Sequence, residues 1–278
     1  MPKISISQTL RFAFSFSFRN AAAIAARIAL PAILGWIAFY LSMFMYMKEL
    51  EKYLIDPSDR VASLVLGLAT AGLLVTLYLH TVMVASVTAL ALGREDGGWK
   101  YFHAARREWR LYAADLRLLL ATAIWLGAMQ LLRFAAGLAS VPAGFGFGLD
   151  AITVCGLGYL AVRIWSLVAP VSVASAHGEI LRRAWRLSAG NSWSLAAIVA
   201  VFLLVGLVAE AACEFAMRVG GLIPPFPSSA SLADYAAMYR EALPGVLLVV
   251  GIAYLVSNIL LTAARVSVYR QLTEQTVL

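Results

Sequence analysis

Two polar residues that could bind a ligand or transfer a proton lie inside long apolar stretches of the chain. Arg163 stands in YLAVRIWSLVAPVS, and His80 stands in YLHTVMVASVT. An unpaired arginine inside a bilayer costs roughly 2.5–3.5 kcal/mol, so it should face protein or a wet cavity. We consider two roles for Arg163: reaching inward or bonding carbonyls freed near Pro170, and pairing with an anionic headgroup or ligand. For His80 we consider an interhelical hydrogen bond, and a proton-relay or ligand-binding role.

The remaining acids and bases do not form a catalytic or metal-binding pattern. His80, His103 and His177 lack the spacing of metal ligands. Glu210 and Glu214 are one helical turn apart and could bind a cation, but we interpret them as two solvated acids at a helix end. The sequence shows no paired buried carboxylates and no order of nucleophile, base and acid that fits an active site. We therefore expect no enzymatic activity, no metal and no cofactor.

Two further motifs have ordinary structural interpretations. GFGFG, residues 144–148, lacks the lysine of a phosphate-binding loop, so we interpret it as a tight turn between helices. Cys155 and Cys213 are interpreted as two buried small apolar side chains. A disulfide between them on the outer side of the membrane is the alternative.

A basic phrase centred on tryptophan occurs twice, as RREWRLYA from Arg106 and as RRAWRLSA from Arg182. On a helix, each copy separates its arginines from its apolar residues, which is typical of a helix at the headgroup boundary. The phrase could serve as an orientation anchor, or it could bind a specific anionic lipid or a partner. The candidate contacts for a lipid headgroup or ligand are Arg163, His80, Arg106, Arg107, Trp109, Arg110, Arg182, Arg183, Trp185 and Arg186.

The segment LRFAFSFSFR, residues 10–19, is interpreted as an eroded third copy of this phrase. Its alternating phenylalanines would suit a strand, but we favour a helix, because a lone strand would leave its backbone unpaired in a bilayer. Asn20, Asp115 and Asn191 each stand where a span is expected to begin, with a side chain able to cap a helix. The expected organisation is a single membrane domain, 1–278, built from tandem units at about 4–92, 97–176 and 178–270.

Composition predicts an all-α polytopic membrane protein. Of the 278 residues, 62% are hydrophobic and 13% are charged, whereas soluble proteins average about 25% charged residues. Helices are expected because a bilayer offers no water to the backbone. The six expected spans are 21–47, 61–92, 113–139, 151–176, 192–217 and 245–268. The connection 218–244, which contains LADYAAMYREAL, is expected to lie on the membrane surface.

The distribution of basic residues predicts the orientation. With both termini inside, about two-thirds of the 22 Lys and Arg residues fall on the inner side, as cytoplasmic loops require. Arg19 and Arg27 interrupt the region where a signal peptide would be apolar, so none is expected. A basic rim of this kind suits anionic lipid headgroups better than nucleic acid.

The stretch YLAVRIWSLVAPVSVASAHGEILRRAWRLSAGNSWSLAAI, residues 159–198, carries a resemblance to a known family. An arginine in the fourth span, a proline near its inner end and a basic helix leading into the fifth span make it similar to the glycerophosphoryl diester phosphodiesterase membrane domain family and allied uncharacterised six-helix bacterial inner-membrane proteins. In that family the phosphodiesterase chemistry belongs to a separate soluble barrel domain. The resemblance therefore implies a bacterial integral membrane protein without that chemistry.

These observations lead to one expected function and one alternative. We expect a non-enzymatic protein of the bacterial inner membrane that binds, organises or modulates lipids or partner membrane proteins. The alternative is a transporter of a lipid or amphipathic small molecule, with a mid-membrane cavity near Arg163 and His80. The expected partners are anionic lipid headgroups on the inner face; a membrane-protein partner or a homo-oligomer stays open, and nucleic acid is not expected.

Overall fold

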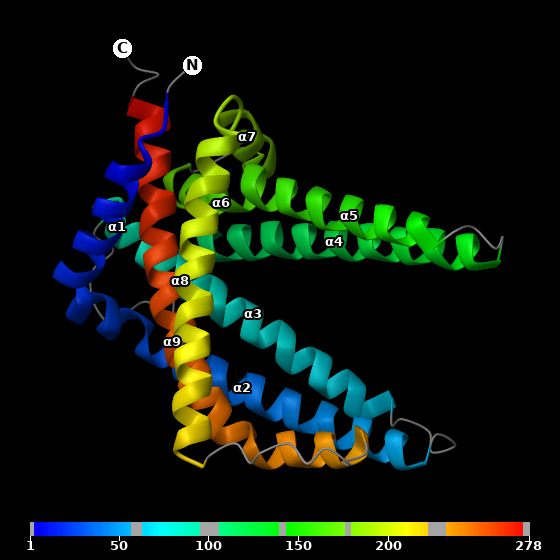
Figure 1. The fold of residues 1–278 in the computed structure, drawn as a ribbon. Coiled ribbons are helices and arrows are strands. Elements are labelled where there is room, and N and C mark those ends of the chain that lie inside the picture. The colour runs from blue at the N-terminus through cyan, green and yellow to red at the C-terminus, as the bar shows by residue number, and fades with distance from the viewer. Residues whose placement is uncertain are drawn as a thin grey trace. The chain divides into compact units, whose positions relative to one another are not determined.

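The computed structural model (Figure 1) describes residues 3–56, 63–94, 106–138, 143–175, 179–221 and 232–274. All regular structure in these ranges is helical, as the composition predicts. The helices are α1 (Ile6–Arg19), α2 (Ala21–Ile55), α3 (Ser63–Ala91), α4 (Arg106–Leu138), α5 (Ala143–Leu160), the π-helical segment η1 (Ala161–Trp165), α6 (Ser166–Ala174), α7 (Ile180–Leu187), α8 (Ser192–Val219) and α9 (Leu232–Glu274).

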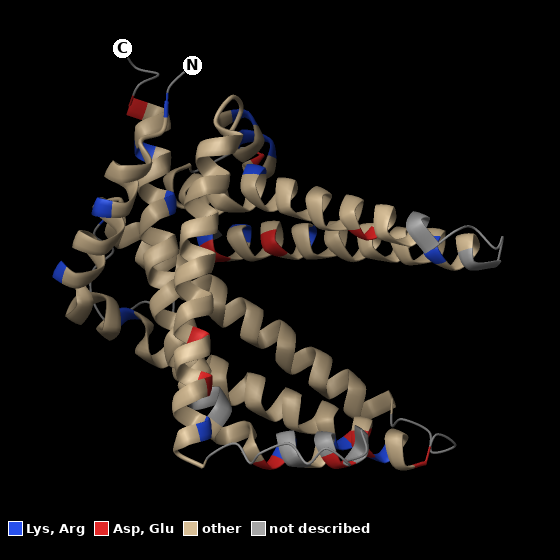
Figure 2. Ribbon diagram, viewed as in Figure 1, with Lys and Arg blue, Asp and Glu red and all other residues tan. Residues whose placement is uncertain are grey.

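Six helical stretches are long and apolar enough to cross a membrane, which confirms the expected multi-pass architecture. They are Ala21–Ile55, Ser63–Ala91, Arg107–Ala136, Gly146–Ala174, Ser192–Val219 and Val249–Glu274. Each exceeds the roughly 20 residues that the hydrocarbon core requires. Charge is sparse along them: α3 carries no Lys, Arg, Asp or Glu, and the charged residues of α8 lie toward its C-terminal end (Figure 2).

The chain divides into two compact units, each assembled from separate segments. Unit 1 contains Met1–Phe16, Thr88–Ala200 and Thr262–Leu278, and unit 2 contains Ser17–Val87 and Val201–Leu261. The boundaries cross helices α1, α3, α8 and α9, so they do not coincide with the tandem units expected from the sequence. Those tandem units stay a prediction.

Unit 1 has its core around α6. Every residue from Ser166 to Val173 is buried, and α6 contacts α4, η1 and α7. Leu111 of α4 and Ala184 of α7 are among the most deeply buried side chains of this unit. The short helix α6 is therefore the element against which the surrounding helices of unit 1 are placed.

Unit 2 brings α2 and α3 together through small residues. A side chain at Gly72 would overlap the Ser42 hydroxyl, and a Cβ at Gly35 would lie 3.6 Å from the Leu79 Cβ. The Thr76 hydroxyl donates to the Gly72 carbonyl at 2.9 Å and lies 3.4 Å from the Gly35 carbonyl. Close approach through glycine and small hydroxyl residues is the usual way in which membrane helices associate.

The two copies of the basic phrase differ at the point where the span was expected to begin. Asn191 directly precedes α8, as expected, but Asp115 lies inside the continuous helix α4, so the prediction for Asp115 is wrong. Gly190 has φ of 79° between α7 and α8. The first copy has Ala114 at the matching position, and a side chain disfavours positive φ. The first copy therefore continues as one helix, whereas the second breaks.

The other expected boundaries are partly revised. GFGFG lies within α5, so the expected turn is wrong. A bilayer helix satisfies backbone groups that a loop would leave unpaired, which offsets the cost of about 1 kcal/mol for each helical glycine. The segment from Leu232 forms the start of α9 and continues through Pro244 into the sixth span.

The N-terminal segment is a helix, α1, in agreement with the interpretation of LRFAFSFSFR. Phe12 and Phe16 stack with ring centroids 5.6 Å apart, as residues one turn apart on a helix can. Asn20 stands between α1 and α2 and makes no side-chain hydrogen bond that caps α2.

Candidate functional site

Arg163 has polar partners around its whole guanidinium group. It lies in η1 of unit 1 with 8% of its surface exposed. Its guanidinium donates from Nε to the Ser188 hydroxyl at 2.8 Å, from Nη1 to the Tyr159 hydroxyl at 2.7 Å and from Nη2 to the Trp185 carbonyl at 3.0 Å. The charge is therefore met by polar groups of the protein, as burial in a span requires.

Two aromatic rings surround the same guanidinium. Its central carbon lies 4.1 Å from the Trp185 ring centroid and 5.5 Å from that of Tyr159. The two rings meet edge to face with centroids 5.8 Å apart. Cation–π contact adds about 0.5–2 kcal/mol, more where water is excluded. Arg163 thus joins the fourth span to α7 by both hydrogen bonding and stacking.

These contacts revise the predicted role of Arg163. The carbonyl that it binds belongs to Trp185, near the end of α7, and not to the turn before Pro170. The π-helical segment widens the helix at Arg163, and such segments often occur at functional positions because they redirect side chains. Arg163 therefore binds a backbone carbonyl, as one of its two predicted roles requires, but this carbonyl belongs to α7 and not to the turn before Pro170.

Helix α7 presents its basic side outward. Ala184 is fully buried, and α7 contacts α6 and η1, so its apolar side packs on protein. Arg182, Arg183 and Arg186 are exposed, and Arg182 forms an exposed ion pair with Glu179 at 3.2 Å. The packing of α7 on α6 and η1 therefore fixes the position of this basic surface.

The first copy of the phrase uses its arginines differently. Arg107 Nε contacts the buried Glu108 Oε1 at 2.6 Å, and Arg110 Nη1 donates to the Ser175 carbonyl at 2.8 Å. Trp109 is exposed and lies edge-on to Tyr112 with centroids 5.8 Å apart. The side chain of Arg106 lies outside the described residues.

A second arginine joins Arg110 at the end of α6. Arg94 donates from Nη1 to the Val173 carbonyl at 2.7 Å and from Nη2 to the Ala174 carbonyl at 2.8 Å. The last carbonyls of a helix have no partner within it and carry partial negative charge, so a cation there stabilises the helix end. Arg270 makes the same kind of contact with the carbonyl of Ala91, the last residue of α3, at 2.8 Å.

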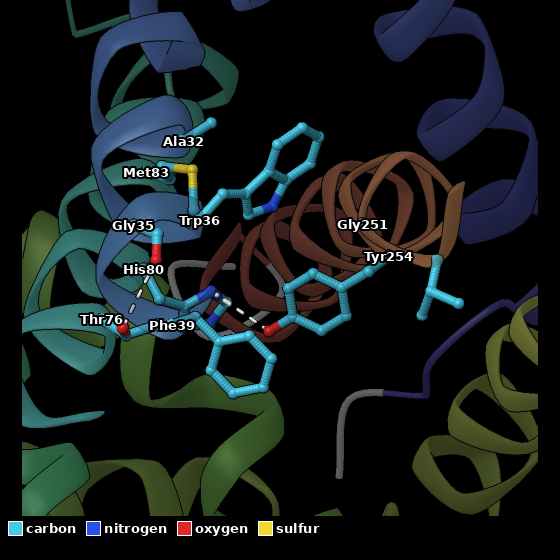
Figure 3. Close-up of a pocket in the computed structure, with 10 residues that line it drawn as sticks. Ala32, Gly35, Trp36, Phe39, Thr76, His80, Met83, Gly251 and Tyr254 are labelled. Carbon is cyan, nitrogen blue, oxygen red and sulfur yellow. Dashed lines mark hydrogen bonds between the residues drawn. The ribbon is translucent and has the colours of Figure 1, made fainter. Parts of the chain in front are cut away.

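His80 lines a cavity in unit 2. The cavity has a volume of about 380 Å³ and is formed by α2, α3 and α9 (Figure 3). The His80 Nδ1 lies 3.3 Å from the Tyr254 hydroxyl and 3.3 Å from the Asn258 amide nitrogen. These contacts confirm the predicted interhelical hydrogen bond. The lining residues are Ala32, Gly35, Trp36, Phe39, Thr76, His80, Met83, Val250, Gly251 and Tyr254.

Arg163 and His80 belong to different units, and only His80 lines this cavity. A single cavity near both residues, as the transporter alternative proposes, therefore stays a prediction.

The remaining predicted residues do not join either group of contacts described above. His103 and His177 lie outside the described residues, and Glu214 pairs with Arg218 at 2.7 Å. Among the described residues, no group of His, Cys, Asp and Glu is arranged to hold a metal ion. Cys155 and Cys213 are both free thiols; Cys155 is exposed and Cys213 is partly exposed, so the predicted burial of the two side chains is wrong.

The six spans and the buried arginine define a multi-pass, all-α membrane protein. No protein family, curated protein or solved structure matches the chain. The resemblance carried by residues 159–198 stays a prediction.

Proposed function

We propose that this chain is a non-enzymatic protein of the bacterial inner membrane, with both termini in the cytoplasm, that binds anionic lipid headgroups through α7. The observation that carries the proposal is the exposed basic side of a helix whose opposite side is fixed to the protein. Arg182, Arg183 and Arg186 form this basic side, and Ala184 is fully buried beneath it.

The way α7 is held supports lipid binding. An interfacial amphipathic helix commonly binds by burying its apolar face at the boundary between headgroups and hydrocarbon. Here Arg163 binds the Trp185 carbonyl and the Ser188 hydroxyl, so α7 is already positioned before any lipid binds. Each arginine near an anionic surface contributes about 1 kcal/mol. Three arginines together favour an anionic over a zwitterionic lipid by up to about 3 kcal/mol.

The neighbourhood of α7 is consistent with the headgroup level. Trp193 is 89% exposed and is the second residue of α8, which begins at Ser192. Tryptophan is enriched at the boundary between headgroups and hydrocarbon. An exposed tryptophan at the start of the fifth span therefore supports placing the adjacent basic helix at the membrane surface.

Lipid selectivity tests the proposal directly. The full chain is reconstituted in phosphatidylcholine vesicles, and electron paramagnetic resonance measures the motionally restricted fraction of spin-labelled phosphatidylglycerol and of spin-labelled phosphatidylcholine. We expect a preference for phosphatidylglycerol that weakens with added salt. The triple variant Arg182→Gln, Arg183→Gln, Arg186→Gln should lose most of this preference.

A matched triple variant controls for the loss of charge. Lys48, Arg133 and Arg218 are exposed cations that we assign to the outer side, and their replacement by Gln removes the same formal charge. This control should keep the preference. Equal selectivity in the wild type and in the α7 variant would overturn the role of α7.

Transport of a lipid or amphipathic small molecule is the second candidate function. The cavity in unit 2 favours it, because a carrier needs an internal site for its cargo. This second function would use the surroundings of His80 and does not depend on α7.

A further inference from the structure

The cavity of unit 2 has a polar end and an apolar end. Figure 3 shows the His80 imidazole, the Tyr254 hydroxyl and Thr76 gathered at one end, while Trp36, Met83 and Ala32 lie toward the other. A ligand that fits both ends must be amphipathic.

The polar end can both donate and accept hydrogen bonds. The His80 Nδ1 lies 3.3 Å from the amide nitrogen of Asn258, which can donate, and 3.3 Å from the Tyr254 hydroxyl, which can donate or accept. The Thr76 hydroxyl donates to the Gly72 carbonyl at 2.9 Å, and its oxygen keeps acceptor capacity. A hydroxyl group of a ligand, which donates and accepts, suits this end.

The apolar end is shaped by a close contact between helices. A Cβ at Gly251 would lie 2.7 Å from the Trp36 Cζ2 and 2.8 Å from its Cε2. The absence of a side chain at Gly251 therefore lets the Trp36 indole lie against the backbone of α9. This packing sets the position of the indole that forms one wall of the cavity.

None of the described residues that line the cavity carries a formal charge. A phosphate or carboxylate there would be desolvated without a counter-ion, which is costly inside a membrane protein. The volume of about 380 Å³ lies near the lower end of the roughly 300–1,000 Å³ typical of small-molecule sites. The site therefore suits one hydrocarbon chain with a small uncharged head.

We propose that this cavity binds a single-chain membrane lipid whose head is uncharged and bears a hydroxyl group, the class of long-chain alcohols and monoacylglycerols. The hydroxyl contacts Thr76 and His80, and the chain lies along Trp36 and Met83. The site is independent of the basic surface of α7, which contacts charged headgroups.

Photolabelling of the reconstituted full chain tests this site. The probe is hexadecanol with a diazirine in the middle of its chain, and the labelled positions are mapped by peptide mass spectrometry. We expect labelling concentrated on the lining stretches of α2, α3 and α9, and competition by unlabelled mono-oleoylglycerol. The matching probe with a sulfated hydroxyl should label these stretches more weakly, because its head is anionic.

Two pairs of variants separate binding from folding. Thr76→Val removes a lining hydroxyl and should lower labelling about fivefold, the effect of one neutral hydrogen bond. Thr70→Val is its control, because Thr70 lies on the exposed side of the same helix and makes the same kind of bond, to the Leu66 carbonyl at 2.8 Å. Gly251→Ala should also reduce labelling by displacing Trp36, whereas Gly245→Ala should not, because a Cβ at Gly245 meets nothing within 4 Å.

Two outcomes of these labelling experiments would contradict the proposal. Labelling spread evenly over the lipid-exposed helices, with the hydroxyl and sulfate probes equal, would identify bulk lipid contact and overturn the site. Equal labelling of Thr76→Val and Thr70→Val would overturn the role of the polar end. Both outcomes leave the phosphatidylglycerol selectivity of α7 untouched, so the two proposals fail separately.

Discussion

At the scale of single residues, Arg163 shows how a membrane protein accommodates a buried cation. Its guanidinium has three hydrogen-bond acceptors, two of which lie at the end of α7. It also lies against the faces of two aromatic rings. The planar, forked group of arginine can meet these partners at once, whereas the compact ammonium of lysine cannot. The residue is therefore a connector between the fourth span and α7.

Arg163→Lys should loosen α7 without unfolding the chain. We expect a loss of about 1–3 kcal/mol, since the charged hydrogen bonds lose their geometry. Hydrogen exchange of the amides in 180–188 should accelerate, and that measurement is the test. Arg133→Lys, at an exposed pair with Asp150, should change neither this exchange nor the thermal midpoint. Unchanged exchange in Arg163→Lys would contradict the connecting role.

At the scale of helices, a single position decides whether the basic phrase forms a separate helix. Gly190 adopts a left-handed conformation, and α7 and α8 are separate. Ala114 stands at the equivalent place in the first copy, and α4 runs through it. The two copies also differ in their contacts, because Arg110 binds the carbonyl of Ser175 while the arginines of α7 are exposed.

Gly190→Ala should destabilise the junction between α7 and α8. A side chain in the left-handed region costs about 1–2 kcal/mol, so the thermal midpoint followed by circular dichroism should fall. Gly158→Ala is the matched control, because a Cβ at Gly158 meets nothing within 4 Å. That helical position should be unchanged or slightly more stable with alanine. Equal midpoints for the two variants would show that the φ of Gly190 is not a constraint.

At the scale of the whole molecule, the chain has two units whose segments are interleaved along the sequence. The orientation that we propose is testable at the ends of described helices. In a cysteine-free background, Asp56→Cys should react with an impermeant maleimide in intact cells, because it follows the end of α2 that we assign to the outer side. Ala189→Cys, between α7 and α8, should react only after lysis. Reversed labelling would overturn both the orientation and the cytoplasmic location of α7.

The membrane-spanning helices could be predicted from the sequence, but the contacts between their side chains could not. Apolar length alone predicts six helices, because a bilayer leaves the backbone no other spanning structure for such a composition. GFGFG was misread because glycine signals turns in water, whereas inside a bilayer the helix is retained. The site was harder still. His80 and Arg163 stood out as polar residues in apolar runs, but Trp36, Gly251 and Tyr254 look like any apolar helix positions until the helices pack together.

The net charge of +7 does not by itself say which basic groups are available to bind an anionic molecule, because some arginines bind helix ends. Arg94 and Arg270 donate to the last carbonyls of α6 and α3, and Arg110 donates to the carbonyl of Ser175, which directly follows α6. These carbonyls occupy guanidinium donors that the phosphate of a headgroup would otherwise accept from. Arg183 and Arg186 of α7 are exposed, so they compete better for an anionic molecule than the three arginines at the helix ends.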